Sequence, residues 1–391
     1  MILALKLAYR NLIGAGLRTW LNVIILSFSF VLIIFMKGII SGWDQQAKTD
    51  MKNMEIGGGQ YWHELYDPFD PFTLTDSHAP VPPEVMEEIN TGDMVPVLIA
   101  PGTIYPQGRL QSVVIKGIDP GQHLFALPTR SLDTISDAIP AMIGALMAKS
   151  LKASKGDVMT LRWRDVNGTF DARELIITEI FSSNVPQIET GQIYVPLETL
   201  RDMMQMPGEA TILTFRDSEK VRPELQNWDI KTTAELTASI DSLIKTKTAG
   251  QTVLFLILLL LALLAVFDTQ VLSIFRRQKE IGTYIALGYT RSQVVGLFTV
   301  EGTMHAILAA ILSVVYGLPF LAWMAKSGLH MPVDTSEFGM AIAQTLYPVY
   351  PAGLVIMTII IVTTATAVVS YWPSRRISRM NPTDALRGKL Q

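Results

Sequence analysis

The chain has 391 residues, of which 49% are hydrophobic and 17% are charged. That balance is too apolar for an ordinary soluble domain and too charged for a chain buried wholly in lipid, so it predicts a membrane protein with a large aqueous part. The net charge of −3 excludes a strongly basic nucleic-acid binder, and the lack of cysteine excludes disulfides, thiolate metal sites and a cysteine nucleophile.

Four segments are long and apolar enough to cross a bilayer, which takes about 20 residues. In chain order the predicted regions are a cytoplasmic amphipathic helix (1–20), span one (21–40), an extracytoplasmic α+β domain (41–251), span two (252–275), a cytoplasmic helix (276–293), span three (294–325), a short outside loop (326–352), span four (353–372) and a cytoplasmic tail (373–391). We therefore predict an α-helical membrane protein with four transmembrane helices, one before and three after a large α+β domain.

Lysine and arginine predict the orientation of the spans, because both are enriched in cytoplasmic loops. Cations gather before span one, between spans two and three, and after span four, which places these three segments on one side. Residues 41–250 instead hold 18 Lys/Arg against 29 Asp/Glu and are predicted to lie on the translocated side. We therefore expect both termini in the cytoplasm.

Within the large domain, short β-rich runs alternate with helical patterns, which favours an α+β fold. The predicted strands cover residues 112–118, 158–163, 174–180, 193–196 and 210–215, and the predicted helices cover 83–89, 141–152 and 197–205. Asn167-Gly168 predicts a tight hairpin turn between two of the strands. Residues 233–250 have helical character and run directly into span two, so a continuous helix could transmit motion between membrane and domain.

Residues 61–83 stand apart, with five aromatic side chains, five prolines and two histidines. One interpretation is an extended surface loop. The other is a contact with an apolar substrate or a partner, since exposed aromatics beside proline-rich chain favour recognition. His63 and His78 lie near several aspartates, but their spacing fits no dedicated metal motif, so we predict no metal site.

The sequence contains no phosphate-binding GxxxxGKS/T loop, no GxSxG elbow and no HExxH pair. We therefore expect no catalytic residues and no cofactor in this chain. Ionisable residues inside the spans leave another possibility open, because charge in lipid is costly and usually functional. Asp268, Glu301 and His305 qualify, so a carrier driven by an ion gradient remains an alternative.

Residues 273–298, SIFRRQKEIGTYIALGYTRSQVVGLF, form an unusual link between spans two and three. The segment combines four cations, Arg276, Arg277, Lys279 and Arg291, with several small residues. Small residues permit close approach of another surface, and the cations can pair with acidic groups or lipid headgroups. A helix that contacts a partner and an amphipathic helix held to lipid both fit this pattern.

Three stretches carry a family resemblance: VLSIFRRQKEIGTYIALGYTRSQVVGLFTVEG at residues 271–302, RNL at 10–12 with LRT at 17–19, and NPTDALR at 381–387. Together they resemble the FtsX-like permeases, the superfamily that includes MacB and the lipoprotein-releasing permeases LolC and LolE. The one-plus-three order of spans is also characteristic of that family, and LolC and LolE are similar in length and layout.

In that family the short helix between spans two and three docks in a groove on a separate P-loop ATPase, which binds ATP and Mg. The resemblance therefore implies an ATPase partner and a second permease, either an identical copy or a sister chain. The residues that it assigns to the ATPase contact are Arg276, Arg277, Lys279, Glu280, Ile281, Gly282, Ala286, Leu287, Gly288 and Arg291. It also implies that Asp268 and Glu301 are polar positions within the membrane, at the seam between the two permeases.

The function implied by the resemblance is extraction of lipoproteins from the outer leaflet of a bacterial inner membrane, with the large domain in the periplasm. Ile24, Phe28, Leu32 and Phe35 share one face of span one and are candidates for contact with the cargo, beside membrane lipids. Residues 162–174 predict a short hairpin where LolC has an extended hook for its chaperone, which argues against direct handover to such a chaperone. Two alternatives stay open: MacB-like efflux of amphiphiles or peptides with an adaptor, and transmission of motion to a periplasmic protein.

Overall fold

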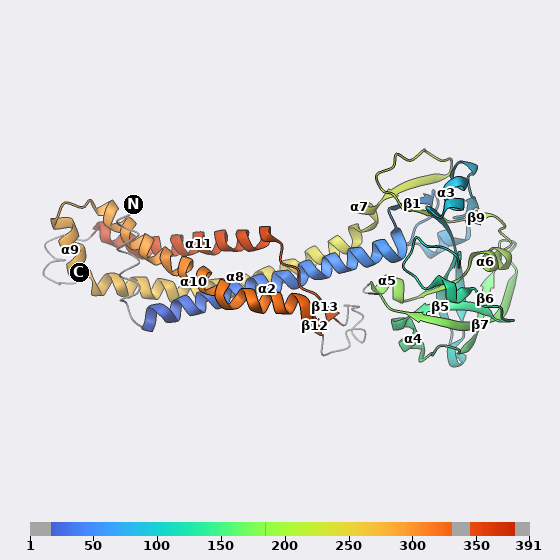
Figure 1. The fold of residues 1–391 in the computed structure, drawn as a ribbon, viewed down its shortest axis with the longest axis horizontal. Helices are drawn as coiled ribbons and strands as arrows, with labels where there is room; N and C mark the ends of the chain where they lie inside the picture. Colours follow the sequence, from blue (N-terminus) through green and yellow to red (C-terminus); the bar gives the residue numbers. More distant parts are fainter. Residues whose placement is uncertain (1–16, 184, 331–344, 380–391) are drawn as a thin grey trace. The chain divides into compact units, whose positions relative to one another are not determined.

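The computed structural model describes residues 17–183, 185–330 and 345–379, and the chain divides into two compact units (Figure 1). Among the described residues, the helical unit consists of 17–42, Ile244–His330 and 345–379, and the β-rich unit consists of residues within Trp43–Leu243. Most of the predicted N-terminal helix, much of the predicted loop after span three, and the family-like stretch at 381–387 lie outside the described residues.

Among the described residues, four long helices and one short helix form the helical unit (Figure 1). Their bounds are α2 Leu17–Met51, α8 Ala238–Arg276, α9 Gln278–Ala286, α10 Arg291–Ser327 and α11 Ala352–Ser374; the short strands β12 Leu329–His330 and β13 Thr345–Leu346 pair between α10 and α11. Each long helix contains a segment that is long and apolar enough to cross a membrane. One such helix precedes the β-rich unit in the sequence and three follow it, which confirms the predicted fold class.

The helices α2 and α8 continue well beyond their apolar segments, and the boundary between the two units falls within both of them. The extension of α2 is polar but contains no proline. Within it, Lys48 pairs with Asp44, one turn away at 3.0 Å, and with Asp241 of α8 at 2.5 Å. An ion pair at four-residue spacing supports a helix where hydropathy gives no signal, so for α2 the sequence pattern alone marks only the apolar part. For α8, the predicted helix that runs into span two is confirmed from Ala238 onward.

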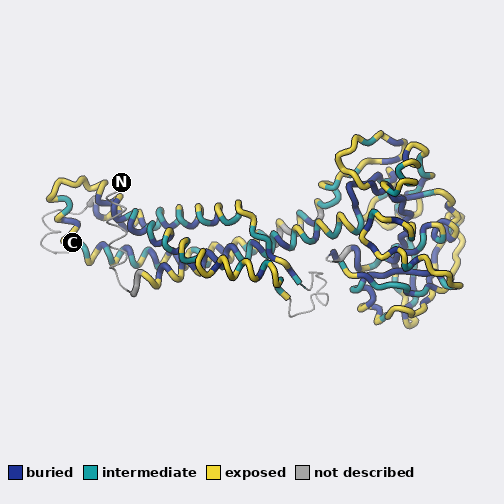
Figure 2. Tube along the Cα trace, in the orientation of Figure 1, coloured by how far each residue is buried: buried dark blue, intermediate teal, exposed yellow. Residues whose placement is uncertain are grey.

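Figure 2 marks the buried parts of the helical unit in dark blue, and the side chains of its core are apolar. The buried cluster contains Val23, Leu26 and Phe30 of α2, Ala262 and Val266 of α8, Ala306 and Ala309 of α10, and Val362 of α11. On α11, hydroxyl residues Thr358, Thr366 and Ser370 share the buried face. Small side chains allow membrane helices to approach closely. Exposed apolar residues cover other faces of these helices, as expected for surfaces that meet lipid or another subunit.

A nine-stranded sheet organises the β-rich unit, in the order β11-β1-β10-β3-β4-β8-β5-β7-β6. The strands are β1 Gly59–His63, β3 Met94–Ile104, β4 Gln111–Ile118, β5 Ile139–Gly144, β6 Val158–Arg164, β7 Phe170–Phe181, β8 Gln192–Pro196, β10 Ile212–Phe215 and β11 Trp228–Thr232. Because β6 also pairs with β3, six of the strands close into a ring, and the other three extend from β3. The helices α3 Met86–Thr91, α4 Ala145–Leu151, α5 Pro186–Glu189, α6 Leu197–Met204 and α7 Thr233–Leu236 complete the unit with the short pair β2 Ala79–Pro80 and β9 Glu209–Ala210.

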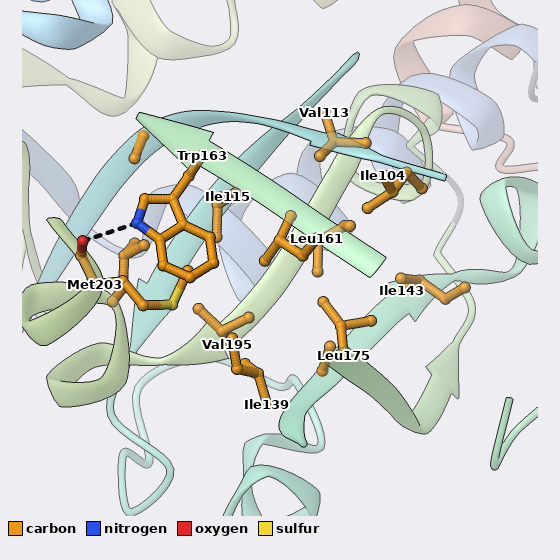
Figure 3. Packing of buried hydrophobic residues seen from close by; sticks show 14 of the residues in the cluster. Ile104, Val113, Ile115, Ile139, Ile143, Leu161, Trp163, Leu175, Val195 and Met203 are labelled. Carbon is orange, nitrogen blue, oxygen red and sulfur yellow. Dashed lines mark hydrogen bonds between the residues drawn. The ribbon is translucent and has the colours of Figure 1, made fainter. Parts of the chain in front are cut away.

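The ring encloses an apolar core (Figure 3). Side chains along β6 alternate between exposed and buried, so Leu161 and Trp163 point inward, as a two-residue strand period requires. The indole Nε1 of Trp163 donates a hydrogen bond of 2.8 Å to the backbone oxygen of Met203 (Figure 3). A buried indole needs such a partner, and this bond fixes α6 against the ring.

Most of the predicted elements of the large domain are confirmed, including the hairpin turn at Asn167-Gly168 and the helix at 197–205. The predicted helix at 141–152 is wrong in its first part, because residues up to Gly144 belong to β5 and the helix begins at Ala145. Strand β5 lies between β7 and β8 and is buried throughout, so it lacks the alternation that marks a half-exposed strand. The proposed helix at 83–89 is a 3-10 turn followed by α3.

Candidate functional site

The segment singled out in the sequence forms a tight corner between two long helices. The chain leaves α8 at Arg276, forms the short helix α9, and enters α10 at Arg291. Gly288 takes a positive φ of 94° in the turn after α9, a conformation that favours glycine. The amide of Thr290 donates to Gln293 Oε1 at 2.9 Å, and the Gln293 amide donates to Thr290 Oγ1 at 3.3 Å. This reciprocal capping fixes where α10 starts.

Arg277 connects the helices of this corner through hydrogen bonds to two carboxylates. Its Nη1 donates to both carboxylate oxygens of Glu301 on α10, at 2.8 and 2.9 Å, and its Nε donates to Glu280 of α9 at 2.7 Å. The guanidinium also lies 4.9 Å from the ring centroid of Phe298. Hydrogen bonds between charged groups are stronger than neutral ones, and the Glu301 carboxylate is almost wholly buried. One cation therefore joins the end of α8, the first turn of α9 and the third turn of α10.

The inner side of α9 is apolar. Ile281 is fully buried against Val294, Val295 and Phe298 of α10, in a cluster that also contains Ile274 and Ile377. Gly282 is buried beside it. Both residues, which the resemblance assigns to the ATPase contact, are therefore buried within this chain.

The outer side of the corner is exposed. Of the ten residues assigned to an ATPase contact, Ile281 and Gly282 are buried and Arg277 is half-buried; Arg276, Lys279, Glu280, Ala286, Leu287, Gly288 and Arg291 are exposed. Leu287 is 72% exposed, and Tyr289, which the sequence reasoning missed, is exposed beside it. The Tyr289 ring packs edge-on against Tyr284 at 5.8 Å. An exposed apolar tip with cations around it is suited to contact with another protein.

The two polar residues predicted to lie at a seam between permeases have different surroundings within this chain. Glu301 is buried and paired with Arg277, so its charge is neutralised within the chain. Asp268 is exposed on α8, on a face that also carries exposed Leu261 and Leu264. Asp268 therefore remains available to a partner.

A polar centre lies where α8, α10 and α11 meet at Gly302. A Cβ atom added to Gly302 would come within 2.3 Å of Ser370 Oγ and 3.0 Å of Gln270 Cδ, so both side chains reach this glycine. His305 Nδ1 donates to the Gly302 carbonyl at 3.1 Å. All three side chains are buried, and Gln270 Oε1, His305 Nε2 and Ser370 Oγ have no hydrogen-bond partner among the described residues. The sequence reasoning missed Gln270 and Ser370; single polar residues in apolar helices were the available signal.

The four residues of α2 that are predicted to contact the cargo differ in their exposure. Ile24 and Phe28 are exposed, whereas Leu32 and Phe35 are half-buried. The Phe35 ring lies 5.4 Å from the ring of Phe320 on α10, so it contributes to packing within the helical unit. Of the four residues, Ile24 and Phe28 are therefore the more exposed, and the cargo contact stays a prediction. No cluster of histidine or carboxylate residues among the described positions is arranged to hold a metal ion.

Comparison with known proteins relates the C-terminal part of the chain to one family. Residues 252–382, which include α9, match the family model of the FtsX-like permease C-terminal region. Over 234 residues the chain is 22% identical to the macrolide export ATP-binding/permease protein MacB of Agrobacterium fabrum, covering 56% of this chain; it spans about a third (34%) of that relative's length. Among solved structures it is similar to the periplasmic region of MacB from Actinobacillus actinomycetemcomitans, at 12% identity and a TM-score of 0.31, over 49% of this chain and 96% of that one.

Proposed function

This chain carries an FtsX-like permease domain and is a permease of the FtsX/MacB type, and from that premise we propose that it couples ATP hydrolysis by a separate ATPase subunit to extraction of lipoproteins from a membrane leaflet. In this proposal it lies in the inner membrane of a bacterial cell, with both termini in the cytoplasm and the β-rich unit in the periplasm. A second permease completes the complex, and ATP and Mg bind to the ATPase.

The proposal rests on one observation: the short helix α9 is held firmly against α10. Its inner side is held to α10 by Ile281 and by the ion pair of Arg277 with Glu301, while Leu287 at its C-terminal end is exposed. Because these contacts oppose independent movement of α9, a partner that pushes on Leu287 would displace α8 and α10 together. A loosely attached helix would absorb the same displacement.

Exposed apolar side chains support a lipid-anchored cargo. Ile24 and Phe28 of α2, and Leu261 and Leu264 of α8, are all exposed within apolar helices. A surface of this kind can accept an acyl chain, for which each buried CH₂ contributes about 0.8 kcal/mol. The second candidate is efflux of amphiphiles through an adaptor, which the macrolide-export name of the MacB relative favours. Transmission of motion to a periplasmic protein would use the same α9 contact.

Substitution of Leu287 by aspartate tests the proposed coupling. A charge placed in an apolar contact costs about 3 kcal/mol, or about a hundredfold in affinity. We therefore expect the L287D variant to lose the ATPase subunit when the tagged complex is purified in mild detergent. The matched control is Val221→Asp, because Val221 is 92% exposed but lies in the β-rich unit.

Two readouts separate the parts of the proposal. Equal recovery of an ATPase subunit with L287D and with the unmodified chain would refute the α9 contact. Mass spectrometry of the unmodified complex distinguishes the cargoes: acylated protein supports lipoprotein extraction, whereas an adaptor without acylated protein supports efflux.

A further inference from the structure

A tandem repeat lies in the segment that follows β1. Residues 67–72 read Asp-Pro-Phe-Asp-Pro-Phe. In the first repeat, the Asp67 carboxylate accepts the amide N–H of Phe69 at 2.9 Å; in the second, the Asp70 carboxylate accepts the amide of Phe72 at 3.0 Å. Aspartate bonded to the amide two residues ahead, with proline between, is a preferred turn because proline fixes φ. The chain therefore builds the same turn twice in succession.

The residues on both sides of the repeat are packed against the sheet. The ring of Tyr66, before it, packs edge-on against Trp62 of β1 at 5.0 Å. Leu74, after it, is buried in the apolar cluster that contains Val95 and Val97 of β3. Thr73 Oγ1 also donates to the Asp70 carbonyl at 2.8 Å. We call residues 64–76 the Asp-Pro-Phe loop, and these contacts fix both of its ends.

The two phenylalanines are directed into solvent. Phe69 is 86% exposed and Phe72 is 88% exposed, more than any other aromatic side chain among the described residues. Scattered surface leucines need no explanation, but two adjacent turns that each present a phenyl ring are a different case. Both rings belong to the β-rich unit and not to the apolar segments that are long enough to cross a membrane.

Negative charge surrounds the rings. Glu64, Asp67, Asp70 and Asp76 are all exposed, and the loop contains no lysine or arginine. Carboxylates beside apolar side chains oppose insertion into a membrane, because moving a charged group out of water costs free energy. They also oppose docking on a second copy, because residues 41–250 carry 18 Lys/Arg against 29 Asp/Glu. The charge pattern is complementary to a basic surface on another molecule.

We propose that the Asp-Pro-Phe loop is a docking element that inserts Phe69 and Phe72 into an apolar pocket rimmed by lysine and arginine on a separate protein. Aromatic anchors in pockets supply much of the energy of many interfaces. Turns that are already formed reduce the conformational entropy lost on binding. This role of the loop does not depend on ATP coupling at α9.

Site-specific photocrosslinking tests the proposal in cells that express the full chain and its native partners. Benzoylphenylalanine is placed at position 69 or 72, and the crosslinked residue is mapped by mass spectrometry. We expect a crosslink to a protein other than this chain, at an apolar residue with lysine or arginine close by, and at least a fivefold lower yield when the other phenylalanine is alanine. Benzoylphenylalanine at Val221, equally exposed in the same unit, is the matched control.

Three results would overturn the proposal: crosslinks to lipid, crosslinks to a second copy of this chain, or yields at both positions no higher than at Val221. The charge argument has its own test once the partner is mapped. Asparagine at Asp67 and Asp70 keeps the oxygen that accepts the phenylalanine amides but removes the charge. The D67N/D70N variant should bind the partner several-fold more weakly at low salt and show less salt dependence; an unchanged salt dependence would refute the basic pocket.

Discussion

At the scale of single residues, Arg277 lies between two carboxylates that differ in burial. Glu301 is nearly inaccessible, whereas Glu280 is more than half exposed. Removal of one partner from a buried pair leaves an uncompensated charge, which costs about 3 kcal/mol, while an exposed pair contributes about 0–1 kcal/mol. Glu301→Gln should therefore lower the apparent Tm of the protein in detergent clearly more than Glu280→Gln does.

Replacement of both members of the inner pair provides the control. Arg277→Met combined with Glu301→Met leaves neither charge unpaired, so we expect it to recover part of the stability lost in Glu301→Gln. If Glu280→Gln and Glu301→Gln lower the apparent Tm equally, the buried pair of Arg277 with Glu301 does not hold the helices together.

His63 gives the β-rich unit a pH dependence. Burial lowers the pKa of its imidazole, and Nδ1 accepts the Leu65 amide at 3.3 Å. A lowered folded-state pKa means that the unfolded chain binds the proton more readily, so stability is highest above about pH 6.5 and is lost as the pH falls through the folded-state pKa. The apparent Tm of the full chain should therefore fall between pH 7.5 and pH 5.

Substitution by asparagine isolates this contribution, because the amide oxygen can still accept the Leu65 N–H. His63→Asn should flatten the decline in Tm with falling pH, even if it lowers Tm at pH 7.5. His123→Asn is the matched control, since it removes an exposed imidazole from the same unit. A decline that remains as steep in the His63→Asn protein would show that other groups cause it.

At the scale of helices, the crossing of α10 over α11 depends on Gly302. A methyl group there would meet Ser370 Oγ and Gln270 Cδ, and overpacking of this kind costs about 1–3 kcal/mol. Gly302→Ala should therefore lower the apparent Tm in detergent. Gly296→Ala on the same helix should leave it unchanged or raise it, because no atom lies within 4 Å of the added methyl group and alanine is the better helix former.

A second substitution, which makes the neighbouring residue smaller, tests whether crowding at Gly302 causes this loss of stability. Ser370→Gly removes the nearest obstructing atoms, so the double variant with Gly302→Ala should recover stability relative to Gly302→Ala alone. If Gly302→Ala and Gly296→Ala behave alike in thermal unfolding, α10 and α11 do not approach as closely as described.

The sequence predicted those elements in which the spacing of apolar residues follows the pattern of buried positions. Strand β6 alternates and its hairpin turn contains Asn167-Gly168, so both were predictable. Strand β3 was not, because Pro96 and Pro101 argue against a central strand, although each lies opposite a partner residue in the ladder. The corner helix followed from its cations, but the partner of Arg277 did not. Glu301 is 24 residues away in the sequence, and only the packing of α9 on α10 brings the two side chains together.

At the scale of the whole molecule, the average composition combines a charged region with four apolar helices. Residues 41–250 contain 47 of the 67 charged side chains, and the four apolar helices account for the high hydrophobic fraction. The one-plus-three layout could therefore be predicted from hydropathy alone. The orientation of the chain in the membrane stays a prediction from the distribution of cations.

The closed ring of strands limits how the β-rich unit can aggregate. Of the strands described in the nine-stranded sheet, only β11 has a neighbour on one side alone. A free edge offers unpaired amides and carbonyls to other chains, which is the usual route to strand exchange. β11 is only five residues long and carries Asp229 and Lys231, and short charged edges resist such pairing. The described sheet of this unit therefore offers other chains only a short, charged edge for strand exchange.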